Sequence, residues 1–153
     1  MKKILEKLKQ KGIPEKGFFH VENISNYNDH LLGLDSDNYI ILLIKCQINK
    51  NDINPISSVG EYLNILYQNE CKIKKESSEF LDKYTVLQLK SNNNILENTF
   101  LNICEYILNK LGDNPVLDNT ITVLESIKKL FSKLLNSSSK TELGLWGELF
   151  LIY

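Results

Sequence analysis

Apolar side chains recur at helical spacing through the second half of the chain. After Asn94, the residues on one such stripe are Leu96, Phe100, Ile103, Cys104, Ile107 and Leu111. A stripe of this kind predicts an amphipathic helix that packs one side on a core. Asn94 is predicted as its N-cap, with Glu97 three residues later completing a capping box. Gly112 and Pro115 predict the end of the helix.

A second helix is predicted to begin at Asp118 or Asn119. Its apolar face comprises Leu124, Ile127, Leu130, Phe131, Leu134 and Leu135. The polar stretch at residues 136–140 interrupts this pattern, and Ser139 with Glu142 forms a second capping box. A third, terminal helix is therefore predicted from there to the last residue.

Apolar residues in the first half of the chain form short runs or alternate with polar ones, which is typical of strands. The turn sequence at residues 35–38 separates the segment 30–34 from the segment 39–46, so the two predict an antiparallel hairpin. The segment 39–46 has too few polar residues to alternate. It predicts a central strand covered on both faces.

More strand patterns follow the loop at residues 47–61. They lie at residues 61–68, 71–77 and 83–91, and the second alternates Cys71 and Ile73 with lysines. In the third, Tyr84 and Val86 are predicted to point inward. Residues 3–11 predict a short amphipathic helix ahead of all the strands.

These elements predict an α+β fold, with a mostly antiparallel N-terminal sheet followed by two to three packed C-terminal helices. The chain divides into a sheet-rich region at 1–92, a helical pair at 93–137 that packs on the sheet, and a last helix at 138–153.

Composition narrows the classes of protein. The 153 residues are 42% hydrophobic and 24% charged, as expected for one globular domain, and the net charge of -1 argues against a free-standing duplex-DNA binder. All basic residues are lysine, so no guanidinium fork is present to grip phosphate or guanine. The cysteines lack zinc-site spacing, and Cys46 and Cys104 are interpreted as buried thiols.

The start of the chain is amphipathic and has no continuous apolar segment typical of a signal peptide. No apolar run is long enough to span a bilayer. We therefore expect a cytoplasmic protein with no membrane partner.

One triplet, Glu70-Cys71-Lys72, has the letters of a nuclease motif. Alternation along a strand would put the carboxylate and the ammonium on one face, where they could hold a divalent cation and meet a phosphate. Asp52 is the one plausible upstream acidic partner. The alternative is a solvated strand face, since Lys74 and Glu76 continue the same side.

His20 and His30, with Asp29 or Glu22, are candidate metal ligands, although such histidines are more often partly exposed side chains without a metal. Phe18, Phe19, Tyr27 and Tyr39 are candidates for stacking on bases. Lysines do not interleave with these aromatics, so core packing or a partner surface is the preferred interpretation.

The terminal segment, TELGLWGELFLIY, is apolar on all sides of a helix except at Glu148. One face carries Trp146, Leu149, Phe150 and Tyr153. A helix of this kind belongs in an interior, where a carboxylate must be paired or bound to a metal. The alternative is a helix end from which Glu148 reaches solvent.

The stretch GLWGELFLI, residues 144–152, resembles a motif of a family of PD-(D/E)XK nucleases found near restriction and phage-defence genes. FLNICEYILNKL, residues 100–111, is similar to a helix that precedes this motif in the family. The resemblance implies that 138–153 is the first helix of a nuclease core. It also implies that Glu148 is a catalytic and metal-binding position, completed by acidic residues and a lysine that lie downstream in the family.

Two hypotheses follow. In the first, the chain is the N-terminal portion of a Mg²⁺-dependent DNA endonuclease of restriction or phage-defence type, and is catalytically incomplete, with no cofactor expected in this portion. DNA would then be a partner of the full-length protein. In the second, the chain is a non-enzymatic interaction module that forms a homodimer or binds a partner protein through the terminal helix.

Overall fold

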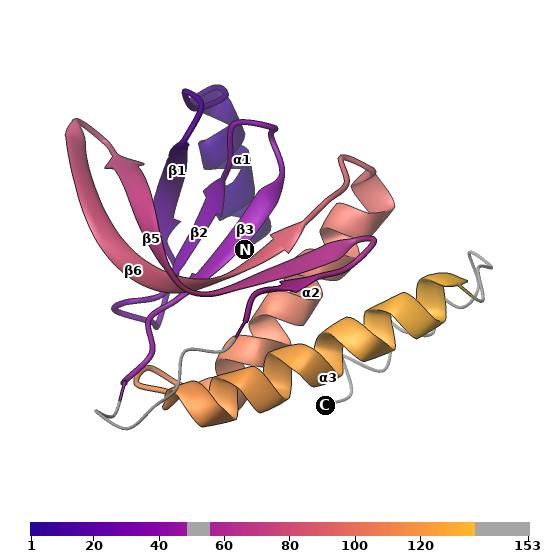
Figure 1. The fold of residues 1–153 in the computed structure, drawn as a ribbon. Helices are drawn as coiled ribbons and strands as arrows, with labels where there is room; N and C mark the ends of the chain where they lie inside the picture. Colours follow the sequence, from indigo (N-terminus) through magenta and orange to yellow (C-terminus); the bar gives the residue numbers. More distant parts are fainter. Residues whose placement is uncertain (49–55, 137–153) are drawn as a thin grey trace.

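The computed structural model describes residues 1–48 and 56–136. The elements in chain order are α1 (Lys2–Gln10), β1 (Phe18–Asn23), β2 (Leu31–Leu34), β3 (Ile40–Ile44), β4 (Ser58–Val59), β5 (Leu63–Lys75), β6 (Ser78–Leu89), α2 (Asn94–Leu111) and α3 (Leu117–Asn136). Strands precede α2 and α3 (Figure 1), so the predicted α+β fold is confirmed.

The sheet closes on itself. Its order is β1-β2-β3-β6-β5-β4, and β1 also pairs with β5, so five strands form a ring that β4 extends on the outside. Strand direction cannot alternate all the way around a ring with an odd number of strands. One parallel pair is therefore unavoidable, and it is β1 with β5, where Phe18 lies beside Lys72 and His20 beside Lys74. The other pairs are antiparallel, as predicted.

The predicted hairpin at residues 30–46 is confirmed as β2 and β3. Asp35 closes its turn, because its Oδ1 atom accepts the backbone N–H groups of Asp37 and Tyr39, both at 2.9 Å. Asn38 takes the left-handed conformation that such a turn needs, with φ of 64°.

β3 is buried on both faces, as predicted. Ile40, Leu42 and Ile44 face the helices, and Ile41 and Leu43 face the inside of the barrel. The two sets belong to two separate cores. The barrel core comprises Val21, Leu31, Ile41, Leu43, Cys71, Ile73, Tyr84 and Val86.

β1, β4, the full length of β5 and the first part of β6, Ser78 to Asp82, were not predicted. The two patterns at residues 61–68 and 71–77 form one strand, bent by an irregularity between Leu66 and Asn69, where Gln68 has φ of 45°. The bend lets one half of β5 pair with β4 and the other half with β1.

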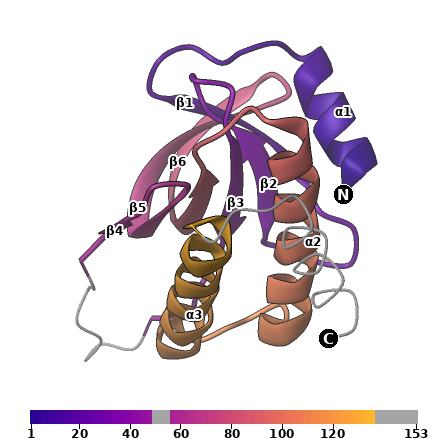
Figure 2. The same cartoon turned by 90° about the vertical axis from the view of Figure 1, so that its right-hand side faces the viewer.

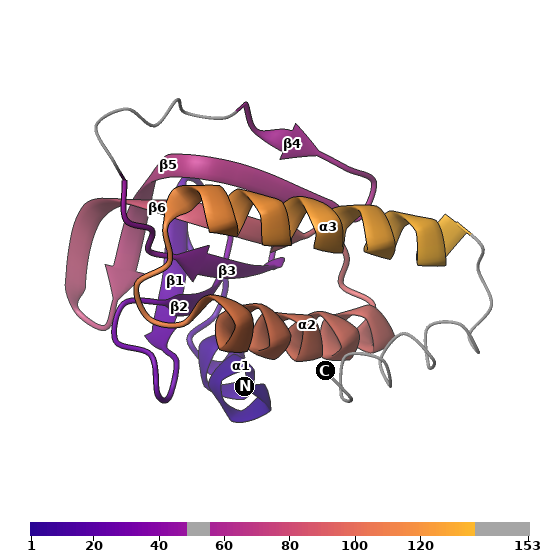
Figure 3. The same cartoon turned by 90° about the horizontal axis from the view of Figure 1, so that it is seen from below.

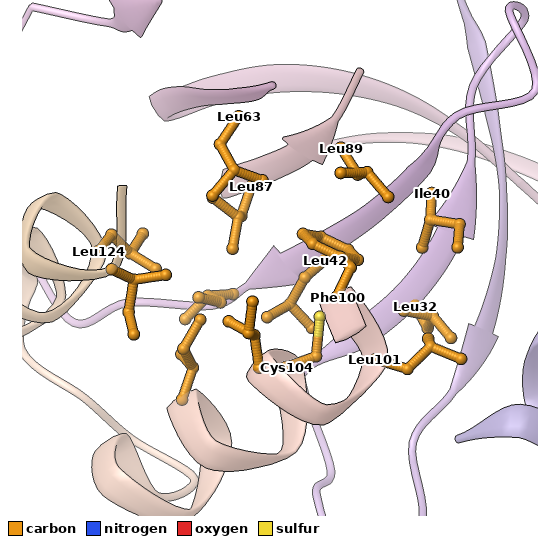
Figure 4. Packing of buried hydrophobic residues seen from close by; sticks show 14 of the residues in the cluster. Leu32, Ile40, Leu42, Leu63, Leu87, Leu89, Phe100, Leu101, Cys104 and Leu124 are labelled. Carbon is orange, nitrogen blue, oxygen red and sulfur yellow. The ribbon is translucent and has the colours of Figure 1, made fainter. Parts of the chain in front are cut away.

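α2 and α3 lie next to each other across one outer face of the sheet, and α1 lies beside them (Figures 2 and 3). Figure 4 shows Phe100 and Cys104 of α2 and Leu124 of α3 meeting Leu42 and Leu87 of the sheet. This helix-facing core is larger than the barrel core.

Three helix details differ from prediction. The N-cap of α2 is Asn93, not Asn94, and its side chain accepts the N–H groups of Ile95 and Leu96 at 2.9 and 3.3 Å. Glu97 therefore closes no capping box. Leu130 is 38% exposed rather than part of the buried face of α3. The side chains of residues 134 and 135 and the capping box at 139–142 lie outside the described part.

Candidate functional site

Glu70 and Lys72 share the exposed outer face of β5, as their spacing predicted, while Cys71 between them is buried in the barrel. The residue opposite Glu70 on β6 is Lys83, and the residue opposite Lys72 is Leu81. Among the described residues, no group of three or more His, Cys, Asp or Glu side chains is placed to hold a metal ion. Asp52, the acidic partner expected for this pair, lies outside the described residues.

The two histidines have different surroundings. His20 is partly exposed, and its Nδ1 atom lies 3.2 Å from the carbonyl oxygen of Gly12. Glu22, a suggested co-ligand, forms ion pairs with Lys7 of α1 and with Lys11, the residue that follows α1, instead. The structure therefore does not join the histidines and their acidic neighbours in one site.

His30 is fully buried and connects the sheet to the corner between α2 and α3. Its Nδ1 atom accepts the Lys45 N–H at 3.1 Å, so the proton resides on Nε2, which donates to the carbonyl oxygen of Gly112 at 2.8 Å. Nearby, the Asn28 N–H donates to Asp113 at 3.2 Å. His30 is thus a structural residue that holds the end of α2 against the sheet.

The aromatic residues are also distributed over several environments. Phe19 packs against the barrel core. The Tyr27 hydroxyl donates to Asn109 of α2 at 2.8 Å, and Tyr39 belongs to the turn closed by Asp35. Phe18 alone reaches the outer face of the barrel next to a cation, with the Nζ atom of Lys72 5.9 Å from its ring centroid.

A polar cluster that the sequence did not predict lies where the end of β3 meets β6. The Nζ atom of Lys45 lies 2.6 Å from a carboxylate oxygen of Asp82 and 3.1 Å from the carbonyl oxygen of Lys83. It also lies 5.0 Å from the centroid of the Tyr84 ring. No local motif could reveal this cluster, because it joins Lys45, just after β3, to residues of β6 that lie 37 or more positions later in the chain.

The electrostatics of this cluster favour a structural role over catalysis. Burial would raise the pKa of Asp82, but the bonds from Lys45 and from the Lys83 amide outweigh it, and the pKa is lowered. Burial and the charge of Asp82 raise the pKa of Tyr84 to about 12. Burial also raises the pKa of the Cys71 thiol. The phenol and the thiol therefore keep their protons at neutral pH, and the cluster offers no activated nucleophile.

Two exposed apolar side chains lie beside charged residues at the β5–β6 hairpin. Phe18, Lys72, Glu79, Phe80 and Leu81 line one shallow depression, which we call the hairpin surface. Leu81 is 59% exposed and Phe80 is 38% exposed. The tip of the hairpin points away from α2 and α3 (Figure 1).

Glu148 and the rest of the terminal segment at 138–153 lie outside the described residues. The other stretch that carries the nuclease resemblance, residues 100–111, lies within α2 and contributes buried side chains to the helix-facing core.

No protein-family model, no curated protein and no solved structure matches this chain. Among the described helices, none has the length and hydrophobicity that a membrane crossing requires.

Proposed function

We propose that residues 1–136 form a non-enzymatic protein-interaction module and that this module lies N-terminal to the catalytic core in a PD-(D/E)XK-type nuclease. One observation carries the first part: the outer surface of the barrel has a covered side and an uncovered side. α1, α2 and α3 lie over the covered side (Figure 3). The uncovered side bears the hairpin surface, where Leu81 projects among charged residues.

The charges of the uncovered side favour a protein partner over DNA. Lys72, Lys74 and Lys83 alternate there with Glu70 and Glu79. A surface that follows a phosphate backbone is positive along its length, which these carboxylates prevent. An apolar centre with a mixed polar rim is instead the usual arrangement of a protein interface.

The nuclease part of the proposal rests on the resemblance of residues 144–152. In that arrangement Glu148 is the one residue of this chain that contributes to catalysis. It would help to hold Mg²⁺, which prefers oxygen ligands, together with acidic residues supplied by the downstream PD and (D/E)XK elements. DNA is then a partner of the whole nuclease rather than of residues 1–136.

A plasmid-cleavage assay tests the non-enzymatic part. Purified protein is incubated with supercoiled plasmid and Mg²⁺ or Mn²⁺, and we expect the plasmid to stay intact. Metal-dependent cleavage that disappears in Glu70→Gln but persists in Glu76→Gln would overturn the proposal, because it would make the Glu70-Lys72 pair catalytic.

Co-purification tests the interaction part. Tagged native chain and tagged Leu81→Lys are isolated from the same source cells, and the bound proteins are identified. We expect a partner that requires Leu81 and that is also retained by Leu130→Lys, a matched change at an exposed leucine of α3. Equal recovery with Leu81→Lys would exclude the hairpin surface as the contact.

The genomic sequence after the Tyr153 codon tests the nuclease part. An in-frame continuation with an Asp and a Glu-x-Lys strand supports it. A stop codon there would remove the nuclease part and leave the interaction module alone.

A further inference from the structure

The first half of β6 has a free edge. β6 pairs with β3 from Thr85 to Gln88, but from Ser78 to Tyr84 it pairs with β5 alone. No other strand or isolated bridge of the described chain occupies that edge. Figure 1 shows the hairpin extending past the end of β3. An open edge of this kind is a template for another strand.

The direction of the backbone groups on this edge follows from Lys83. Its N–H donates to Asp82 Oδ1 at 2.8 Å and its carbonyl oxygen accepts from Lys45 Nζ at 3.1 Å, so both groups point away from β5. In an antiparallel strand this direction repeats at every second residue. The N–H and C=O groups of Leu81 and Glu79 therefore also point away from β5.

The side chains of the same three residues share the outer face of the sheet, because they are two positions apart. Their order is acidic, apolar, basic: Glu79, Leu81, Lys83. Leu81, at the centre, is 59% exposed. A two-fold axis through Leu81 would place each Glu79 opposite the Lys83 of another copy. The edge is thus complementary to itself in charge.

We propose that β6 pairs antiparallel with β6 of a second copy of this chain, with Leu81 on the two-fold axis. The inference rests on the proposed interaction function and names its partner. The two Leu81 residues exchange N–H to C=O bonds. Each Glu79 N–H donates to the Lys83 carbonyl oxygen of the other copy. That oxygen can accept this bond in addition to the one from Lys45, because it has two lone pairs. Lys83 N–H stays bonded to Asp82, so the Lys45–Asp82 pair ends the intermolecular ladder.

Charge also selects this register over its neighbours. Moving the axis to Phe80 would place Glu79 opposite Leu81, and moving it to Asp82 would place Lys83 opposite Leu81, so either shift loses both Glu79–Lys83 pairs. A slip of one residue would direct the free backbone groups of Leu81 at Phe80, whose own groups point back toward β5.

Single charge reversals test the pairing. In Glu79→Lys, a lysine faces Lys83 of the other copy; in Lys83→Glu, a glutamate faces Glu79. Each variant should raise the dimer dissociation constant roughly tenfold in sedimentation equilibrium, from two reversed cross-strand pairs. An equimolar mixture of the two variants should restore native affinity, because each chain then meets the opposite charge at both positions.

The mixture excludes misfolding as the explanation, because two misfolded variants would not regain association when they are combined. Tagged Glu79→Lys should capture untagged Lys83→Glu and should not capture untagged Glu79→Lys. Glu15→Lys and Lys129→Glu, exposed changes of the same charge elsewhere, should leave the native dimer unaffected. A native chain that stays monomeric up to about 1 mM, well above a useful affinity, would overturn the inference. So would a mixture that associates no better than either variant alone.

The outcome is separable from the proposed function. A monomer that still binds another protein through Leu81 leaves the interaction module in place and removes only the self-pairing. Plasmid cleavage that needs Glu70 removes the proposed function, whatever the oligomeric state.

Discussion

The Nζ atom of Lys9 lies 3.0 Å from Oε1 of Glu97, although 88 positions separate the two residues. Glu97 is only 4% exposed, so Lys9 is the charge that compensates a nearly buried carboxylate. On the opposite flank of α1, Lys7 and Lys11 pair with the buried carboxylate of Glu22. These lysines thus fasten the helix to α2 on one side and to β1 on the other.

Removing Lys9 should destabilise the protein more than removing an exposed lysine of the same helix. Lys9→Met leaves Glu97 buried without its cation, and we expect a loss of about 1–3 kcal/mol in the free energy of unfolding. Urea unfolding followed by circular dichroism measures it, with Lys3→Met as the control. Glu97→Gln combined with Lys9→Met should lose less than the sum of the single changes. Equal losses for Lys9→Met and Lys3→Met would mean that the pair contributes nothing.

Stability should fall on acidification through Glu22. Burial would raise its pKa, but the ammonium groups of Lys11 and Lys7 outweigh burial and lower the pKa below the unfolded value of 4.5. A carboxylate with a lowered pKa stabilises the folded state above the unfolded pKa, and this contribution disappears as pH falls through the folded pKa. Urea titrations at pH 7 and at steps below pH 4.5 should show this loss. The loss should be smaller in Glu22→Gln and unchanged in Glu6→Gln, an exposed control on α1.

His30 should be far more sensitive to substitution than His20. His30→Ala leaves the Lys45 N–H and the Gly112 carbonyl oxygen without their partners in a buried site, and we expect a loss of about 2–4 kcal/mol. Hydrogen exchange at residues 112–117 should accelerate in the same variant, because the corner between α2 and α3 loses its connection to the sheet. His20→Ala, at a partly exposed position, serves as the comparison. Similar losses for both histidines would contradict the structural role assigned to His30.

Local patterns were sufficient to predict much of the fold. The apolar run at β3 and the turn at Asp35 predicted a buried central hairpin, because both signals lie within a few residues of each other. The stripe through Phe100 and Cys104 predicted α2 for the same reason. Capping residues were less reliable, since consecutive asparagines at 92–94 offer nearly the same side chain at each position.

Closure of the barrel could not be predicted, because it depends on residues far apart in the chain. β1 is bordered by glycine and polar residues and shows little alternation, and it becomes a strand by pairing with β2 and β5. The Lys45–Asp82–Tyr84 cluster is likewise formed by tertiary contacts alone. For Glu70 and Lys72, the sequence predicted a shared face correctly but could not reveal that Lys83 and Leu81 lie opposite them.

The cysteines should differ in reactivity according to their burial. All three are free thiols with raised pKa values for which burial is the main cause, but Cys46 is only half-buried whereas Cys71 and Cys104 are buried. A protonated, enclosed thiol reacts slowly. Labelling with a thiol reagent at pH 7.5, followed by mass spectrometry, should modify Cys46 first. All three should react in urea, and early labelling of Cys104 would contradict the packing of α2 on the sheet.

Gly33 should be irreplaceable because of how closely β1 approaches β2. A Cβ atom at this position would lie 2.6 Å from the carbonyl oxygen of His20, and 3.2 Å from the Cγ1 atoms of Val21 and Ile41. A backbone carbonyl in a paired strand cannot move aside as a side chain can, so Gly33→Ala should lose at least about 2 kcal/mol in the free energy of unfolding. Thermal and urea unfolding measure the loss.

A second substitution identifies the cause of that loss. Val21→Ala removes the side-chain contact but leaves the His20 carbonyl in place, so it should not rescue Gly33→Ala. If Val21→Ala did rescue the variant, crowding in the barrel core would be the cause. If rescue fails and hydrogen exchange shows that the parallel β1–β5 pairing is weakened, the cause is the separation of β1 from β2. A displaced β1 would weaken that pairing, because β1 is the strand that closes the ring.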